Sequence, residues 1–462
     1  MPPHAAATVT AIPHDPLLVL LVQIGVLLAL ATALGRLAAR CNLPPVVGEL
    51  AAGIVAGPSV LGHLGPGLSH RLFPPDPGTT HMLLAVGQLG ALFLVGITGA
   101  HIDLPLLRRK RSAIGWVSAG SVLLPLAAGV GLGFVLPDAL RGEHGSRTVF
   151  ALFIGVAVAV SALPVIAKTL LDMKLMHRDV GQLIIGAAAV SDIVGWFLLS
   201  VVSATATAGF RAGTVARTAG CLLLILVLTA VARPVTVRLL RSAERSRNAE
   251  GVGVATVVVL LVLASAGTHA LGMEPILGAF LCGIVVGGSG AAGRRFLNLA
   301  RTFVMAVLAP LFLATAGLQA DVSALAHPPV LAAALLTLVV AVGVKLVGGY
   351  AGARLSGADR NAALAVGAGL NARGVVEIVL ASVGLGIGLL TTASYTVIVL
   401  VALVTSVMAP PILRWTTGLI DVTDTELERE RLFVAEPVRP GAVLTGGAVT
   451  REDPQVKGAR HT

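Results

Sequence analysis

Long apolar runs dominate this sequence and limit it to one class of structure. The clearest run covers residues 183–201, whose 19 residues carry a single charge, Asp192. At a rise of about 1.5 Å per residue, a helix of this length crosses the hydrocarbon core of a bilayer. Of the 462 residues, 56% are hydrophobic and 12% are charged. No soluble domain needs so much apolar surface, so the chain is predicted to be an all-α polytopic membrane protein.

Apolar length and helix-breaking residues predict about thirteen membrane spans. The ninth span is short, and an interfacial or re-entrant helix is an alternative for it. Residues 1–16 are expected to form an extracytoplasmic segment, 17–415 the transmembrane domain and 416–462 a short, disordered cytoplasmic tail. The predicted spans are 17–39, 45–64, 81–100, 112–136, 147–171, 181–206, 214–236, 251–270, 273–288, 298–319, 329–355, 360–388 and 390–413.

Basic residues alternate between successive loops and predict the orientation of the chain. Loops after odd-numbered spans hold clusters, such as those at 108–111 and 238–247, whereas loops after even-numbered spans hold isolated arginines such as Arg71 and Arg211. Cytoplasmic loops carry the excess of basic residues, which places the N-terminus outside and the C-terminus inside a cytoplasmic (inner) membrane. The same pattern accounts for the pI near 10.5, so nucleic acid is not an expected partner.

A thirteen-residue motif occurs twice, as PVVGELAAGIVAG from Pro45 and as PILGAFLCGIVVG from Pro275. Six residues keep register at a constant offset of 230 residues. The copies lie in the second and ninth spans, seven apart, and therefore face opposite sides of the membrane. This predicts inverted repeats at about 45–206 and 273–413, an arrangement used by secondary transporters. Chance similarity among glycine-rich helices is the alternative.

Asp192 lies near the middle of its span, where an ionised carboxylate is costly unless it lines a polar cavity or has a partner. Hard cations prefer oxygen ligands, and a carboxylate removed from water binds protons more readily. One carboxylate cannot easily hold a proton and a metal ion at once, so competition for it couples opposite fluxes of the two. We therefore interpret Asp192 as the binding residue for protons and for transported Na⁺ or K⁺. A buried structural carboxylate is the alternative.

Helix breakers interrupt two of the spans. The fifth contains SALP at 161–164, where Pro164 frees backbone groups because it has no N–H. Its repeat partner, the twelfth, contains NARG at 371–374, ending in the helix-breaking Gly374. Paired interruptions in two halves favour an ion site, although an ordinary proline kink is an alternative. The candidate oxygen ligands beside Asp192 are Ser161, Ser191 and Asn371.

Four further charges lie within or near the apolar runs. Lys345 is too deep in the eleventh span to reach water easily, so it needs an anion or a helix C-terminus. It could pair with Asp192 or neutralise the carbonyl ends of the broken helices. Arg373 and Glu377 are four residues apart and are expected to form a structural ion pair. Glu49 is interpreted as an interfacial charge, with a functional role as the alternative.

Four stretches together resemble the monovalent cation:proton antiporter-2 family, within the sodium/hydrogen exchanger superfamily. They are LPPVVGELAAGIVAGP (43–58), SALPVIAK (161–168), AVSDIVGW (189–196) and LNARGVVEIVL (370–380). The resemblance implies a sodium/proton antiporter-like fold of thirteen helices, with an ion-binding core domain and a dimerisation domain, in a homodimer that moves in an elevator-like alternation. It also implies that Asp192 binds the cation and the proton alternately, and that Lys345 is the basic residue facing it.

The sequence departs from this family pattern at two places. Many relatives carry Asp-Asp or Asn-Asp where this chain has Ser191 and Asp192. Ser191 cannot form an ion pair, so Lys345 lacks the partner that the pattern gives it. Relatives that conduct glutathione-gated potassium efflux end in a nucleotide-binding domain that does not occur in this sequence, so nucleotide gating is not expected.

The sequence thus predicts an inner-membrane antiporter that exchanges Na⁺ or K⁺ for protons without a cofactor. A transporter of organic anions on the same fold is one alternative; it would need a basic pocket, for which the sequence offers only Lys345 and Arg373. A transport-inactive sensor or scaffold is another, and the costly Asp192 argues against it. An enzyme is not expected, because the sequence shows no metal-ligand cluster, P-loop or nucleophile motif.

Overall fold

The computed structural model describes residues 14–41, 43–74, 76–100, 102, 110–143, 145–173, 175–176, 178–208, 212–420 and 426. These residues form helices and connecting turns, with one isolated β-bridge between Arg141 and Leu390. Most of the predicted N-terminal segment and of the predicted tail lies outside the described residues. The basic loop residues Arg108, Arg109 and Lys174 also lie outside them.

The helices follow the predicted spans, which confirms the all-α fold. The first half contains α1 (His14–Arg40), α2 (Pro45–Ala56), α3 (Leu61–Leu64), α4 (Pro66–Leu72), α5 (Pro77–Ala100), α7 (Arg111–Val135), α8 (Arg147–Ala159), α9 (Leu163–Asp172) and α10 (Asp179–Ala208). The second half contains α11 (Ala212–Glu244), α12 (Ala249–Ala270), α13 (Pro275–Gly287), α14 (Ala291–Phe303), α15 (Ala309–Gln319), α16 (Pro328–Leu355), α17 (Arg360–Leu370), α18 (Val375–Gly386) and α19 (Thr392–Thr417).

Many of these helices are long enough to cross a bilayer. Among the described residues, ten spans have the required length and hydropathy, and two of them, Pro45–Leu64 and Ala291–Gln319, join α2 with α3 and α14 with α15. Helices α17 and α18, bent by 42° at their break, make an eleventh span when counted as one. The predicted fifth and ninth spans contain shorter apolar helices, α8 and α13. The multi-pass membrane architecture is therefore confirmed, and the count of thirteen stays a prediction.

Helix contacts follow the pairing of the sequence repeat. Helix α2 packs against α15, and α13, which carries the second copy of the motif, packs against α5. A Cβ atom added to Gly53 would lie 1.9 Å from the carbonyl oxygen of Ala314, and one added to Gly283 would lie 1.9 Å from that of Gly96. Only glycine permits such close helix contacts. The two copies of the motif therefore make equivalent contacts with different partners.

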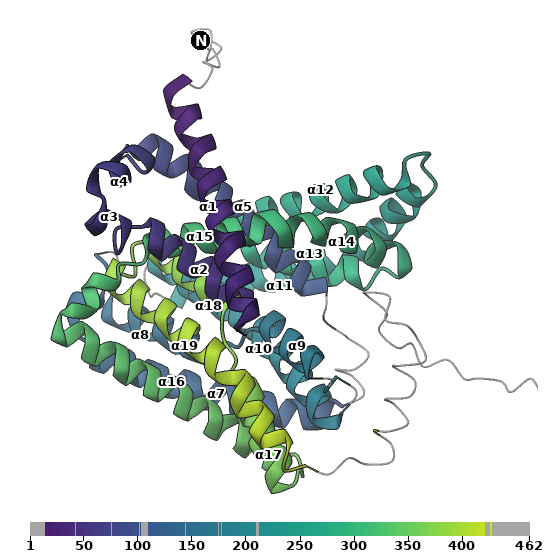
Figure 1. Ribbon diagram of the computed structural model, residues 1–462. Helices are drawn as coiled ribbons and strands as arrows, with labels where there is room; N and C mark the ends of the chain where they lie inside the picture. Colours follow the sequence, from purple (N-terminus) through teal and green to yellow (C-terminus); the bar gives the residue numbers. More distant parts are fainter. Residues whose placement is uncertain are drawn as a thin grey trace, which may run out of the picture.

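Two groups of helices surround the broken ones. Figure 1 shows α1, α2, α5, α12, α13 and α15 in the upper part of the view and α7, α16, α17 and α19 in the lower part. Helix α7 packs along both α8 and α16, and α16 packs along α17. Helix α10 contacts α7, α8, α9 and α17. The breaks of both interrupted spans are consequently buried beside the middle of α10.

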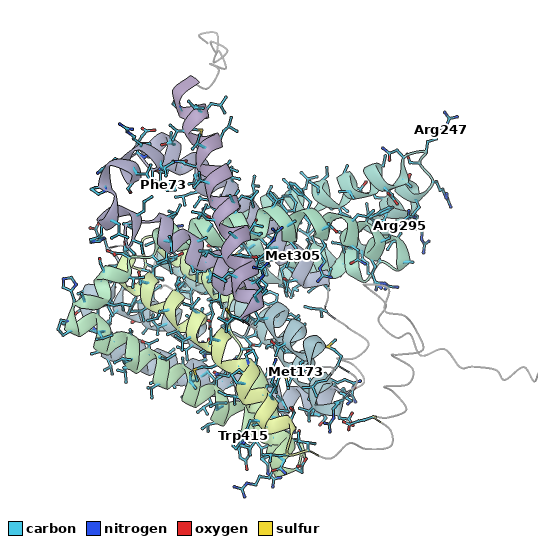
Figure 2. All side chains as sticks on the ribbon, viewed as in Figure 1. Phe73, Met173, Arg247, Arg295, Met305 and Trp415 are labelled. Atoms are coloured by element: carbon cyan, nitrogen blue, oxygen red, sulfur yellow. The ribbon has the colours of Figure 1, made fainter. Side chains whose placement is uncertain are left out.

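The outer helices present apolar side chains that no other helix covers. On α11, for example, Leu223 is 64% exposed and Val231 is 63% exposed. Exposed apolar surface on this scale is typical of contact with lipid. The basic residues gather at helix ends instead, and Figure 2 shows Arg247 and Arg295 at the far end of the helices α12 and α14, away from the broken helices.

Candidate functional site

The breaks of the two interrupted spans lie against each other. Helix α8 ends at Ala159 and α9 begins at Leu163, while α17 ends at Leu370 and α18 begins at Val375. The backbone N–H of Ala162 donates to the carbonyl of Ala372 (3.1 Å). The hydroxyl of Ser161 donates to the carbonyl of Leu370 (3.1 Å). Each break thus supplies hydrogen-bonding partners to the other, as buried backbone groups at membrane depth require.

Local sequence explains both breaks. Pro164 lies in the first turn of α9, where a backbone N–H has no partner within the helix. Gly374 has φ 155° and ψ −116°, a backbone conformation open to glycine alone. A Cβ at Gly374 would also lie 3.0 Å from Cγ2 of Val165 in α9. The break before α18 therefore needs glycine for both its conformation and its packing.

Two cationic side chains hold the C-terminal end of α8. Arg373 donates from Nη1 to the carbonyl of Ala157 (3.0 Å) and from Nη2 to that of Val158 (2.6 Å). Lys345 donates to the carbonyl of Ala159 and to that of Ser121 in α7 (3.0 Å). Cations at a helix C-terminus stabilise the carbonyl groups that lack partners in the helix. Lys345 thus contacts the carbonyl end of α8 directly, and its charge also acts on Asp192.

Arg373 joins three elements of the protein. Besides the end of α8, its Nη2 donates to the carbonyl of Ala341 in α16 (3.1 Å). Its Nη1 lies 2.5 Å from Oε1 of Glu377, and both side chains are 1% exposed. The carbonyl of Arg373 itself accepts a hydrogen bond from the hydroxyl of Ser406 in α19 (2.5 Å). The guanidinium therefore fixes the second break to the first.

Asp192 is fully buried on α10, and no side chain in the described part of the chain donates a hydrogen bond to its carboxylate oxygens. It interacts electrostatically with Lys345 and with the backbone N–H of Leu163, the first residue of α9. The ammonium nitrogen of Lys345 stays on its carbonyls and forms no ion pair with Asp192 among the described residues. Asp192 is thus a buried carboxylate that no side chain holds by a hydrogen bond within the described residues.

The other predicted ligands surround the same crossing. Asn371 is fully buried in the second break, and neither its amide oxygen nor its amide nitrogen has a hydrogen-bonding partner in the described structure. The hydroxyl of Ser191 donates to the carbonyl of Ala159 (3.4 Å). Within the described residues, no group of three His, Cys, Asp or Glu side chains is placed to hold a resident metal ion.

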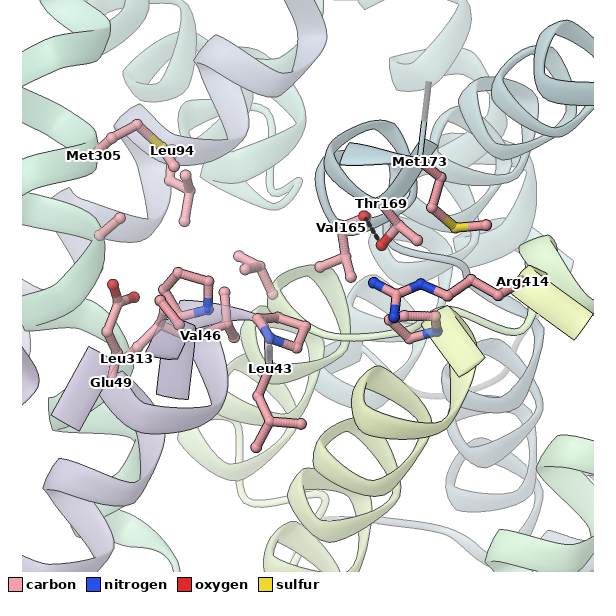
Figure 3. Close-up of a pocket in the computed structure, with 16 residues that line it drawn as sticks. Leu43, Val46, Glu49, Leu94, Val165, Thr169, Met173, Met305, Leu313 and Arg414 are labelled. Atoms are coloured by element: carbon pink, nitrogen blue, oxygen red, sulfur yellow. Dashed lines mark hydrogen bonds between the residues drawn. The ribbon is translucent and has the colours of Figure 1, made fainter. Parts of the chain in front are cut away.

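A cavity of about 500 Å³ leads away from the first turns of α9 and α18. Val165, Thr169 and Met173 line it at the spacing of one helix face, and Val375 lines it from α18. Figure 3 shows Glu49 on one wall of this cavity and Arg414 on the opposite wall. Glu49, interpreted from the sequence as an interfacial charge, thus lines the cavity, and so does Arg414, which was not among the predicted site residues. An arginine in the last turn of a helix, such as Arg414 in α19, has no sequence pattern that would predict a cavity.

The opposite end of the same helices is closed by hydrogen bonds. The hydroxyl of Tyr395 in α19 donates to the carbonyl of Ala316 in α15 (2.7 Å). The backbone N–H of Asp321 donates to the hydroxyl of Thr396 (2.9 Å). At the end of α10, the hydroxyl of Ser203 donates to Glu274. One end of these helices therefore opens into the cavity of about 500 Å³, while the other is tied by hydrogen bonds beside a second cavity of about 310 Å³ lined by Thr315, Leu318 and Gln319.

This fold, with two broken helices crossing beside a buried carboxylate, is that of a secondary transporter. Residues 25–417 match the family described as sodium/hydrogen exchanger, transmembrane, and the chain belongs to that family. The family consists of transporters rather than enzymes, as expected. The resemblance found in the sequence motifs is confirmed.

Individual relatives support the assignment over most of the chain. The Na⁺/H⁺ antiporter NhaS4 of Synechocystis sp. is 30% identical over 400 residues, which cover 86% of this chain and 97% of NhaS4. The Na⁺/H⁺-K⁺ antiporter GerN of Bacillus cereus is 27% identical, covering 86% of this chain and 96% of GerN. Cation/H⁺ antiporter 20 of Arabidopsis thaliana is 29% identical, and the match spans 48% of that longer protein.

A solved structure has the same fold. The sodium/proton antiporter MjNhaP1 of Methanocaldococcus jannaschii superposes with a TM-score of 0.60 at 16% sequence identity. The superposition covers 90% of this chain and 99% of MjNhaP1. The antiporter-like fold predicted from the sequence is therefore confirmed.

Proposed function

We propose that this protein exchanges a monovalent cation, Na⁺ or K⁺, for protons across the cytoplasmic membrane. Asp192 is the shared site, at which the cation and the proton compete. Ser161, Ser191 and Asn371 complete the oxygen-rich surroundings, and Lys345 is the electrostatic partner. The names of NhaS4 and GerN, both antiporters of monovalent cations and protons, support this class of substrate.

One observation carries the proposal. Asp192 is fully buried, no side chain in the described structure donates a hydrogen bond to it, and its polar neighbours are Lys345 and the backbone N–H of Leu163. A buried structural carboxylate would be expected to accept hydrogen bonds, because an unpartnered charge in a low-dielectric interior is strongly destabilising. A carboxylate that binds a proton in one state and a cation in another must release one ligand before it takes up the other. Its oxygens therefore should not be held by hydrogen bonds from other side chains.

An organic-anion transporter on this fold is disfavoured by the contacts of the two buried cations. Arg373 is engaged by the carbonyls of Ala157 and Val158 and by Glu377, while Lys345 is engaged by two carbonyls. Most of their donors are therefore already used by the protein itself, and Nε of Arg373 is the one donor of that side chain without a partner in the described structure. The structural evidence therefore favours a cation as the cargo.

The cavity on one side and the closed contacts on the other support an alternating-access cycle. In this interpretation the cavity opens to the cytoplasm, because it lies beside the ends of α9 and α19, which the basic loops assign to that side. The helices of the predicted repeats, 45–206 and 273–413, would move as an ion-binding core against a dimerisation domain in a homodimer.

Proton flux in proteoliposomes tests the proposal. A trapped pH-sensitive dye reports proton movement after an imposed Na⁺ or K⁺ gradient, with Asp192→Asn compared with the wild type. Asp138→Asn is the matched control, because the Asp138 side chain is 73% exposed. We expect cation-driven flux in the wild type and in the control, and none in Asp192→Asn.

Other outcomes discriminate between the alternatives. Flux that persists in Asp192→Asn would remove the carboxylate from the mechanism. A wild type that moves no protons with either cation, but binds cations at Asp192, would indicate a sensor. The ratio of the Na⁺-driven to the K⁺-driven rate identifies the physiological cation class.

A further inference from the structure

One face of α10 carries a row of polar side chains that begins at Asp192. The row continues with Trp196, Ser200 and Ser203. At 3.6 residues per turn, these four positions fall within about 80° of the helix circumference and span about 16 Å of its axis. The row therefore leads from the middle of the membrane to the end of α10.

Helix α13 covers this row at two points. The rings of Trp196 and Phe280 are in contact, with centroids 6.2 Å apart and planes inclined by 50°. At the end of the row, Ser203 donates a hydrogen bond to Glu274, the residue that precedes α13. Both contacts join α10 to α13, so the row faces α13 along its length.

The middle of the row is polar but dry. Trp196 is 1% exposed and Ser200 is 0% exposed. The indole Nε1–H of Trp196 and the hydroxyl of Ser200 have no hydrogen-bonding partner in the described part of the chain. Buried polar groups normally have partners, and two successive exceptions beside an unpartnered Asp192 call for an explanation. Both groups would gain hydrogen bonds from water if the protein has a second conformation in which this row is hydrated, and that explains their missing partners.

The location of the row agrees with that explanation. The cavity of about 500 Å³ is lined by Met173 at the end of α9 and by Arg414 near the end of α19. The same helix ends meet the start of α10, because Arg178, just before α10, donates to the carbonyl of Ile420 just after α19 (3.2 Å). The row lies on the other half of α10, toward Ser203. The cavity and the row thus approach Asp192 from opposite ends of the same helix.

We propose that the face of α10 formed by Trp196, Ser200 and Ser203 is the access route between Asp192 and the membrane side of Glu274, with Trp196 on Phe280 as its gate and Glu274 as its entry carboxylate. This inference rests on the proposed antiport. When α10 separates from α13, the indole N–H and the Ser200 hydroxyl bind the water that accompanies the ion. The carboxylate of Glu274, released from Ser203, concentrates cations at the entrance.

Side-specific labelling of single cysteines tests the route. In a background with Cys41, Cys221 and Cys282 replaced by serine, Ser200→Cys is exposed to a membrane-impermeant thiol reagent in right-side-out and inside-out vesicles. Val202→Cys is the matched control: it is equally buried on α10 but lies about 160° away around the helix. Glu143→Cys, on an exposed loop close to the start of α19, marks the membrane side of Glu274.

We expect Ser200→Cys to react at least fivefold faster than Val202→Cys, and only from the side at which Glu143→Cys reacts. Equal rates for the two buried cysteines, or reaction of Ser200→Cys from the other side alone, would overturn the route. Ion flux is measured in the same vesicles. Flux with an unreactive Ser200→Cys contradicts the route alone, whereas side-specific reaction without any flux in the parent protein contradicts the antiport alone.

Transport kinetics test the role of Glu274 with a variant that does not alter packing. Glu274→Gln should raise the KM for the cation at least threefold when the cation is offered from the Glu274 side. The KM from the opposite side should stay within twofold of the wild type, as should both values in the exposed control Glu143→Gln. Equal changes from both sides, or no change, would exclude Glu274 as the entry residue.

Discussion

Lys345 and Ser191 donate hydrogen bonds to the same backbone carbonyl, that of Ala159, the last residue of α8. A serine thus stands where the family pattern places a residue able to pair with the lysine. The lysine is held by two carbonyls, and the serine shares one of them. The missing ion pair is replaced by contacts with the backbone of α7 and α8.

This relationship predicts unequal effects of two substitutions. Lys345→Met removes the charged donor from the carbonyls of Ser121 and Ala159 and should destabilise the protein by about 2–4 kcal/mol. Ser191→Ala should cost less than about 1 kcal/mol, because Ala159 keeps Lys345 as a donor. Thermal unfolding in detergent, followed by tryptophan fluorescence, compares them. A larger loss for Ser191→Ala would show that the serine, not the lysine, holds the end of α8.

Cation binding at Asp192 predicts a stabilisation that depends on this residue. At a cation concentration ten times the Kd, the folded state gains about 1.4 kcal/mol. Raising Na⁺ or K⁺ at constant ionic strength, with choline as the balancing ion, should therefore raise the Tm of the wild type and of Asp138→Asn. The Tm of Asp192→Asn should not change. An equal rise in Asp192→Asn would place the binding site elsewhere.

Replacing Arg373 and its acidic partner Glu377 together should not restore the stability that is lost when Arg373 alone is replaced. Arg373→Met should destabilise the protein by about 3–5 kcal/mol, because it leaves Glu377 as a buried, unpaired charge. For a simple ion pair, the double substitution Arg373→Met with Glu377→Met would recover much of that loss. Here it should recover little, because the carbonyls of Ala157, Val158 and Ala341 still lose their donor. A double-mutant cycle of Tm values measures the recovery.

Gly374 should tolerate no side chain. Gly374→Ala places a Cβ at φ 155° and 3.0 Å from Val165, with an expected cost of about 1–3 kcal/mol. Adding Val165→Ala relieves the contact but not the backbone strain, so it should restore only part of the stability. The comparison control is Gly386→Ala, where a Cβ meets no atom within 4 Å. Full recovery in the double variant would show that the contact alone matters.

Asp76, at the start of α5, makes a contribution to folding stability that depends on pH in the acid range. The backbone N–H of Thr79 donates to the Asp76 carboxylate (3.0 Å) and lowers the pKa of Asp76 below its ordinary value of 3.8. A lowered pKa means that the stabilisation is present above the unfolded-state pKa and is lost as the pH falls through the folded-state pKa. Asp76→Ser keeps a cap without a charge. The Tm difference between the wild type and Asp76→Ser should therefore shrink below about pH 4.

Sequence reasoning located the elements whose signals are local. Apolar length gave the long helices, and the helix breakers at Pro164 and Gly374 gave the positions of both interruptions. The depth of Asp192 within its apolar run marked it as exceptional. These features follow from the energetics of a chain in a bilayer and need no knowledge of neighbours.

The partners across the site could not be predicted in the same way. Lys345 is held by backbone carbonyls, and a carbonyl has no residue identity that a sequence could reveal. Trp196 and Phe280 are aromatic residues in apolar runs. A core residue and a lipid-facing residue have the same sequence pattern, so the contact between these two could not be predicted. Glu274 stands beside a recognised motif but outside its repeated positions, so the repeat gave it no role.

The capping of α8 has a consequence for synthesis of the protein. The carbonyls at 157–159 belong to the first half of the chain, whereas Lys345 and Arg373, which bind them, lie in the second half. A ribosome-bound chain that has emerged only as far as α10 has inserted Asp192 without the cations that secure the adjoining helix end. The candidate site is thus completed only by residues in the last third of the polypeptide.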